Sequence, residues 1–100
     1  MVRHMIIWTL KDEYNSEERT AIRKGIKEGL EGLQGKIPGL LRIQVRTEGL
    51  ASSNADLMLD SLFEDEQALK EYSGHPLHVA VANGKVRPFT AVRSCYDFTE

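Results

Sequence analysis

Met5-Ile6-Ile7-Trp8-Thr9-Leu10 is the stretch of sequence that decides the fold. Successive side chains of a β-strand point to opposite faces, so a strand here would present two different sets of residues. Both sets are apolar: Met5 and Ile7 lie on one face, and Ile6, Trp8 and Leu10 on the other. A strand that is apolar on both faces belongs in a sheet that is covered on both sides.

The sequence that follows predicts a helix, a break and a second strand. Ser16 is the expected N-cap of the helix, and Glu17 and Glu18 suit its first turn. The buried stripe is expected at helical spacing, at Ile22, Ile26, Leu30 and Leu33. Ile37-Pro38-Gly39 ends the helix, and residues 41–47 alternate apolar and polar side chains, with Leu41, Ile43, Val45 and Thr47 on one side. The polar face of this second strand indicates an edge or a rim of the sheet.

The second half of the chain predicts a strand, two helical segments and a final strand. The third strand covers residues 56–63, and Asp65 is expected to cap a helix that carries Ala68, Leu69 and Tyr72 inward. Pro76 should begin a short helix that ends near Asn83-Gly84. The final strand covers residues 92–98, with one face formed by Val92, Ser94, Tyr96 and Phe98.

This order of elements predicts an α+β fold, a ferredoxin-like βαββαβ protomer in which helices cover one face of a four-stranded antiparallel sheet. Residues 1–100 form one domain. The third strand is also apolar on both faces, at Leu57, Met58, Leu59, Leu62 and Phe63. Because the helices cover only one side, we expect the other side to pack against a second copy. The predicted assembly is a homodimer with its sheets face to face, a dimeric α/β barrel.

Composition excludes several classes of partner. Thirteen basic and fifteen acidic residues give a net charge of -2, and the charges are scattered, so nucleic acid is not an expected partner. The longest apolar run is far shorter than the about 18 residues that a membrane span needs, so no membrane association is expected. Cys95 is the only cysteine, and the opening residues lack the pattern of a signal peptide. We therefore expect a cytoplasmic protein without disulfides, in which Cys95 is a buried, inert thiol.

Tyr72-Ser73-Gly74-His75-Pro76-Leu77-His78 is the segment richest in chemistry, because it gathers a phenol and two imidazoles at a helix end. Histidine titrates near neutral pH, and tyrosine can donate a proton or a hydrogen bond. In a structural interpretation, Tyr72 anchors the second helix and His78 bonds a backbone group. In a catalytic interpretation, both line one cavity, where His78 is a general base and Tyr72 polarises a substrate oxygen. The sequence leaves both interpretations open.

Three further residues are candidates for substrate binding: His4, Trp8 and His75. His4 shares the strand face of Ile6 and Trp8 and would reach the same space, unless it is a hydrogen-bonded histidine at the start of the strand. His75 precedes a proline and also suits a structural or capping role. His75 and His78 could hold a metal only with a third ligand from Asp56, Asp60 or His4. We expect no metal and no cofactor.

Gly25, Gly29 and Gly32 lie on one stripe of the first helix, although each costs about 1 kcal/mol relative to alanine inside a helix. One explanation is that the helix approaches its neighbour closely at these positions. The other is that the glycines leave room for a ligand beneath the helix.

Several segments together resemble the stress-responsive dimeric α/β barrel (Dabb) family along nearly the whole chain. They are Val2-Arg3-His4-Met5-Ile6-Ile7, the Ile37-Pro38-Gly39 turn, Phe63-Glu64 after the third strand, Tyr72-x-x-His75-Pro76-x-His78, and Tyr96-Asp97-Phe98. The resemblance implies a ferredoxin-like protomer, a homodimeric barrel and a cavity between sheet and helices. In olivetolic acid cyclase, a plant polyketide cyclase of this family, the catalytic pair falls at the positions of Tyr72 and His78, and no metal or cofactor is used.

The resemblance also sets limits on function. Glycines and charges replace the bulky aromatic residues that line the first helix of the cyclase, so the identity of the substrate does not transfer. The main hypothesis is a small-molecule-binding protein that acts as a cofactor-free cyclase or lyase through Tyr72 and His78. A non-enzymatic, stress-associated binding or scaffold protein is the alternative, and a cofactor-free monooxygenase-like enzyme is a third option.

Overall fold

The computed structural model describes all residues from 1 to 100. Its elements follow the predicted order: β1 (Val2–Leu10), α1 (Ser16–Glu31), β2 (Leu40–Arg46), β3 (Leu57–Phe63), α2 (Glu66–Gly74), α3 (Pro76–Val81), the π-helical turn η1 (Ala82–Val86) and β4 (Thr90–Thr99). The predicted ferredoxin-like βαββαβ arrangement is confirmed.

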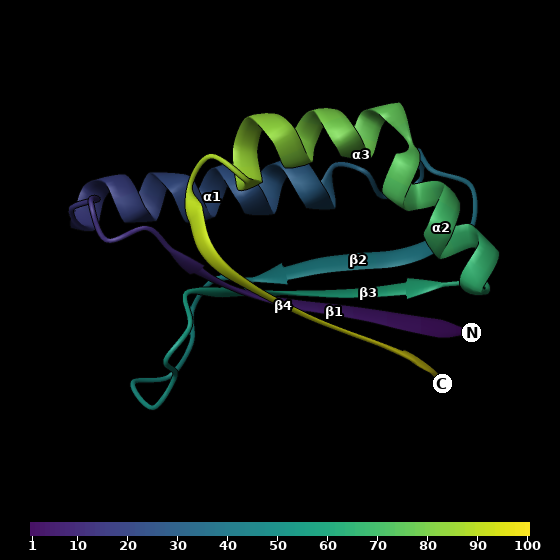
Figure 1. The fold of residues 1–100 in the computed structure, drawn as a ribbon, viewed down its shortest axis with the longest axis horizontal. Helices are drawn as coiled ribbons and strands as arrows, with labels where there is room; N and C mark the ends of the chain where they lie inside the picture. The colour runs from purple at the N-terminus through teal and green to yellow at the C-terminus, as the bar shows by residue number, and fades with distance from the viewer.

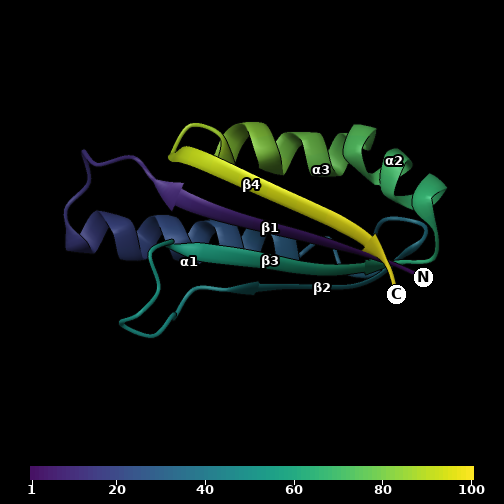
Figure 2. The same cartoon turned by 60° about the horizontal axis from the view of Figure 1, so that its bottom comes forward.

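The four strands form one antiparallel sheet in the order β2-β3-β1-β4. All helices lie on one face of this sheet, and both chain ends lie at the same end of the molecule (Figure 1). Turning the molecule shows β2 at one edge and β4 at the other, with β1 and β3 between them (Figure 2). The prediction that the second strand occupies an edge is therefore correct.

The core fills the space between the helices and the inner face of the sheet. From β1, Ile6, Trp8 and Leu10 point into it, and Ile26 and Leu30 of α1 pack against them. β3 contributes a further three buried side chains, Leu57, Leu59 and Phe63. Burying one large apolar side chain is worth about 1.5–3 kcal/mol, so this layer fixes the helices over the inner face.

Of the two N-caps predicted for the longer helices, one is wrong and one is correct. Asn15, not Ser16, caps α1: its side-chain oxygen accepts from the Glu18 backbone N–H at 2.8 Å, and the Glu18 carboxylate accepts from the Asn15 N–H at 2.9 Å. This reciprocal pair satisfies two N–H groups that Ser16 would leave open. Asp65 caps α2 as predicted, with its carboxylate 2.8 Å from the Ala68 backbone nitrogen.

The register of β2 differs from the predicted alternation. An irregularity between Leu40 and Arg42 inserts Leu41 as an extra residue against β3. As a result Leu40 is buried and Leu41 is 41% exposed, whereas Ile43 and Val45 point inward as expected. A bulge places two successive residues opposite one partner, and strict alternation cannot anticipate it.

Helical structure also continues past the predicted end near Asn83-Gly84, through η1 to Val86. This extension packs against α1. A Cβ atom added to Gly29 would lie 3.0 Å from Val81 Cγ1 and 3.1 Å from Lys85 Cδ, so close helix approach explains this glycine. A Cβ atom on Gly25 would meet nothing within 4 Å, so packing does not explain that one.

The outer face of the sheet carries no helix (Figure 1). Its exposed apolar residues come from the two strands β1 and β4: Ile7, Val92, Tyr96 and Phe98. The same face holds the ion pair between the Arg3 guanidinium and the Asp60 carboxylate, at 2.6 Å. None of the helices combines the length and the apolarity that a membrane crossing would require.

Candidate active site

A cavity of about 230 Å³ lies between the inner face of the sheet and the helices. β1 supplies one wall, through His4, Ile6 and Trp8. Tyr72 at the end of α2 and His78 in α3 also line the cavity. Thus the structure brings together four of the five residues that the sequence singled out, and Trp8 is 3% exposed in the wall.

Tyr72 is the most deeply placed polar residue of this cavity. The residue is 1% exposed, and its ring packs edge-on against Phe63, with 5.0 Å between the ring centroids. Its hydroxyl is buried and has no hydrogen-bond partner. Burial also raises its pKa far above the usual value, so the phenol stays protonated. Tyr72, which lines the cavity, therefore carries an unused hydrogen-bond donor.

His78 lies beside Tyr72 because the chain bends between α2 and α3. Pro76 begins α3, and the ring of His78, in the first turn after it, packs against the Tyr72 ring at an angle of 38°, with 4.1 Å between the centroids. The His78 Nδ1 atom lies 3.3 Å from the Ser73 carbonyl oxygen, which can only accept, so Nδ1 carries the proton. The Nε2 atom of the neutral ring is then left as an acceptor.

The surroundings of His78 favour this neutral form. Burial lowers its pKa; the bond to Ser73 opposes that effect, and the charges of Arg87, His4 and Arg93 lower the pKa further. A histidine with a lowered pKa is unprotonated at neutral pH and can accept a proton. The structural interpretation holds as well, because His78 does bond a backbone group.

His4 reaches the cavity from β1 and is held by Asp97 on β4. The two residues are directly opposite in the antiparallel register, and the His4 Nδ1 atom bonds an Asp97 carboxylate oxygen. The His4 ring is buried and lies 6.3 Å from the Tyr72 ring, centroid to centroid. Sequence reasoning missed Asp97, although it lies two residues beyond Cys95 on the strand face opposite Tyr96 and Phe98.

His75 does not line the cavity. Its Nδ1 atom accepts from the Leu77 backbone N–H at 3.1 Å, which makes it the N-cap of α3. The expected capping role is confirmed, and the structure gives no contact that supports His75 as a substrate-binding residue.

The potential metal ligands also differ from those considered in the sequence. Ligand atoms of His4, Cys95 and Asp97 lie within 4.8 Å of one another, whereas His75 and His78 do not belong to this group. Asp56 and Asp60 bond Arg19 and Arg3 instead.

Cys95, expected to be buried, is exposed on β4. Partial desolvation of its sulfur and the neighbouring Asp97 carboxylate nevertheless raise the pKa of the thiol, with Arg93 opposing them. A raised pKa disfavours the thiolate that a nucleophile or metal ligand requires.

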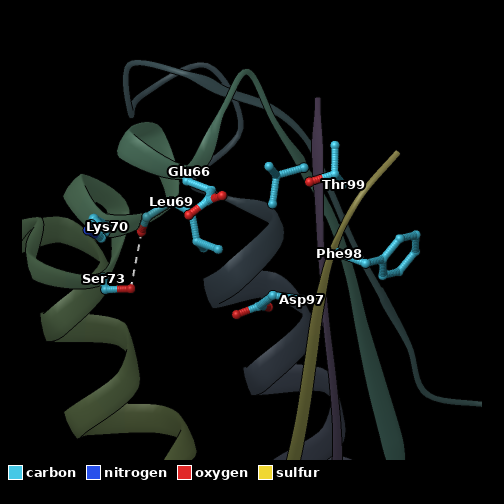
Figure 3. Close-up of a pocket in the computed structure, with 8 residues that line it drawn as sticks. Glu66, Leu69, Lys70, Ser73, Asp97, Phe98 and Thr99 are labelled. Carbon is cyan, nitrogen blue, oxygen red and sulfur yellow. Dashed lines mark hydrogen bonds between the residues drawn. The ribbon is translucent and has the colours of Figure 1, made fainter.

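A wider surface hollow of about 440 Å³ lies between α2 and the end of β4. Figure 3 shows Glu66, Leu69 and Ser73 of α2 on one side of it, with Asp97 pointing toward them and Phe98 pointing away. The Ser73 hydroxyl bonds the Leu69 carbonyl, 3.1 Å away, as within an ordinary helix. With no histidine, tyrosine or unpartnered buried group, this hollow is a weaker candidate than the smaller cavity.

Comparison with known proteins places the chain in a well-populated fold. A family model described as "Stress responsive A/B Barrel Domain" matches residues 2–100. A dimeric protein of unknown function with a ferredoxin-like fold from Bacteroides fragilis is 28% identical, with a TM-score of 0.89, and the match covers 97% of this chain and 93% of that one. No curated protein sequence matches significantly.

More distant structures share the fold with different chemistries. A hydroxynitrile lyase from Passiflora edulis is 14% identical, with a TM-score of 0.71 and coverage of 97% of this chain and 90% of that one. A putative antibiotic biosynthesis monooxygenase from Nitrosomonas europaea is 11% identical, with a TM-score of 0.75 and coverage of 100% and 98%. At these identities only the fold is shared, so the reaction must be inferred from the site.

Proposed function

The chain belongs to the stress-responsive A/B barrel domain family, and from this premise we propose that it binds a small organic molecule in the cavity beneath α3 and catalyses a proton transfer on it. The reaction class is that of a cofactor-free lyase or cyclase. Tyr72 and His78 are the proposed catalytic residues, with His4 and Trp8 in contact with the substrate.

One observation carries this proposal: the buried Tyr72 hydroxyl has no partner in a cavity that it shares with His78. Leaving a buried hydroxyl unpaired costs about 1–3 kcal/mol, so folded proteins rarely retain one without a use. A substrate oxygen placed in the cavity would accept this hydrogen bond. The cost in the free protein would then be recovered when the substrate binds.

The proposed step needs only the chain's own side chains. His78 Nε2 removes a proton from a carbon next to a carbonyl group, and the electron pair moves onto the carbonyl oxygen. The Tyr72 hydroxyl donates a hydrogen bond to the oxyanion that forms, and its high pKa keeps the proton in place. The resulting enolate can attack a second carbonyl, as in a cyclase, or expel a leaving group, as in a lyase.

The resemblance to olivetolic acid cyclase supports the same pair of residues, because its catalytic tyrosine and histidine fall at the positions of Tyr72 and His78. The substrate is a separate matter. A cavity of about 230 Å³ lies below the 300–1,000 Å³ typical of pockets for drug-sized ligands, so the proposed substrate is small.

Exchange of carbon-bound hydrogen for deuterium tests the proposal. Small keto acids and β-keto compounds in D₂O, followed by proton NMR, should exchange faster with the wild-type protein than in buffer. His78→Gln should remove about 100-fold or more of that acceleration, because general base catalysis contributes about 10²–10⁴.

His75→Asn is the matched control, because it removes an imidazole outside the cavity while asparagine preserves the helix cap. Exchange that survives His78→Gln would contradict the catalytic role. Tight binding without exchange would favour the non-enzymatic alternative, and consumption of oxygen would favour the monooxygenase-like one.

We also propose that the protein is a cytoplasmic homodimer joined through the outer face of the sheet. The uncovered apolar residues Ile7, Val92 and Tyr96 support this assembly, and the similar Bacteroides fragilis protein is described as dimeric. Light scattering at micromolar concentration should give the mass of two chains, and Ile7→Glu should give one. A monomeric wild-type protein would contradict the assembly.

A further inference from the structure

The basic side chains that line the cavity have no acidic counterpart among the lining residues. Arg87, which follows η1, and Arg93 of β4 both line the cavity, together with His78. No aspartate or glutamate does so. Arg93 is directly opposite Trp8 in the strand register and therefore belongs to the inner face of the sheet. Two guanidinium groups thus line a partly apolar cavity that has no acid among its lining residues, and Asp97 bonds His4 without lining the cavity itself.

The partners of these two arginines differ from those of the arginines that support the fold. Arg3 pairs with Asp60 and Glu100, and Arg19 pairs with Asp56. Arg87 and Arg93 form no ion pair with a carboxylate; Arg87 bonds only the neutral side-chain amide of Asn83. Both remain exposed, so each is free to bind a negatively charged group from solution.

The rest of the cavity fits an apolar body. Ile6, Trp8 and Val86, all buried, line the same cavity as the arginines and Tyr72. A ligand that spans this space would place an apolar part against these side chains, an oxygen at the Tyr72 hydroxyl and an anionic end at the guanidinium groups. Arginine matches a carboxylate with two parallel N–H bonds, which makes a carboxylate the best-fitting anion for a small cavity.

We propose that the cavity selects a small organic carboxylate, whose carboxylate group is bound by Arg87 and Arg93 and whose apolar body contacts Ile6, Trp8 and Val86. This inference rests on the proposed function, because it names the class of substrate for the same site. In this proposal the two arginines determine which substrate binds, whereas Tyr72 and His78 act on the atoms that react.

Binding of a carboxylate would also affect the pKa of His78, the proposed general base. The charges of Arg87 and Arg93 lower the pKa of His78 in the free protein. Burial, the largest cause of the lowered pKa, remains when a ligand binds, but a bound carboxylate offsets the two charges. The ligand therefore opposes the part of the pKa lowering that the arginines cause.

Calorimetric titration with benzoate and benzamide tests the selection, because the two probes share a ring and differ in charge. Benzoate should bind the wild-type protein more tightly than benzamide does. Arg87→Gln and Arg93→Gln should each weaken benzoate binding by about tenfold or more, since a hydrogen bond to a charged group is worth about 1.5–3 kcal/mol. Benzamide binding should not change. Arg42→Gln on the edge strand β2 is the matched control, because Arg42 lies away from the cavity.

The possible failures are distinguishable. One outcome is that benzoate and benzamide bind with equal affinity, that Arg87→Gln and Arg93→Gln leave both affinities unchanged, and that Tyr72→Phe lowers them. The carboxylate inference would then be wrong, but the cavity would still be the binding site. If neither probe binds, the carboxylate inference is also wrong, and the deuterium-exchange assay judges the proposed function by itself. Benzoate binding that Arg42→Gln weakens as much as the cavity variants do would show nonspecific charge attraction and overturn the inference.

Discussion

Replacing Tyr72 with phenylalanine should make the free protein more stable and the site less effective. The substitution deletes one buried oxygen and keeps the ring contacts with Phe63 and His78. An unpaired buried hydroxyl costs about 1–3 kcal/mol, so removing it should raise the free energy of unfolding by about 1 kcal/mol. For a domain of this size, that change raises Tm by about 4–8 °C.

The same substitution should slow the reaction, because the oxyanion loses its donor. Loss of one such donor typically costs about 10²–10³ in kcat. Differential scanning calorimetry of the unliganded protein and deuterium exchange of a keto acid measure the two effects on the same samples. Tyr14→Phe, at a partly exposed tyrosine outside the cavity, is the control and should change stability by less than about 0.5 kcal/mol. If Tyr72→Phe were destabilised by 1 kcal/mol or more, the hydroxyl would have a structural partner and the reasoning would be refuted.

Three further predictions concern the glycines of α1, the turn at Gly39 and the titration of His78. Gly25→Ala should stabilise the protein by about 1 kcal/mol in urea unfolding, because its Cβ atom meets open space, and Gly29→Ala should gain less, because Val81 and Lys85 must move. Equal gains would contradict the packing of α1 on α3. Gly39→Ala should cost about 2–4 kcal/mol, since Gly39 has a φ of 83° and its Cβ would lie 2.5 Å from Ala68 Cβ; a neutral effect would show that the turn can rearrange. Because burial lowers the His78 pKa, the unfolded chain binds the proton more readily. Stability should therefore fall as pH drops below about 6.5, and His78→Gln should reduce that slope; an unchanged slope would contradict the direction of the shift.

The fold followed from the sequence because strand parity is a strong signal. The two-faced apolar strands and the helical stripe at Ile26 and Leu30 define which side the helices cover, and the structure agrees. The parity of the last strand was also correct, since Tyr96 and Phe98 face outward together with Ile7. These patterns depend only on the period of each element, which does not require knowledge of its neighbours.

The fold predictions were wrong at positions where two neighbouring residues suit the same structural role. Asn15 and Ser16 are both good N-caps, and the choice depends on Glu18, which can return a bond only to the residue three positions before it. Leu40 and Leu41 are equally apolar, so the sequence does not show which of them the bulge turns outward.

The candidate site was only partly predictable for a related reason. Tyr72 and His78 are close in sequence, and a local bend between helices brings their rings together. The pairing of β4 with β1 brings Arg93 to the cavity and Asp97 to His4, and that register comes from the folded sheet rather than from a local pattern. Arg87 lines the cavity from the end of η1. The sequence could not show whether His75 caps a helix or contacts a ligand, because a residue before a proline suits both roles.

The three histidines provide the most direct test of the central claim, that the cavity beside Tyr72 and His78 is the binding site. Their imidazole signals can be followed by proton–carbon NMR while a small keto acid or benzoate is added to the wild-type protein. His4 and His78 line the cavity and His75 does not, so the signals of the first two should shift while that of His75 stays constant. A ligand that binds and shifts only His75, or none of the three, would place the binding site elsewhere and contradict the account.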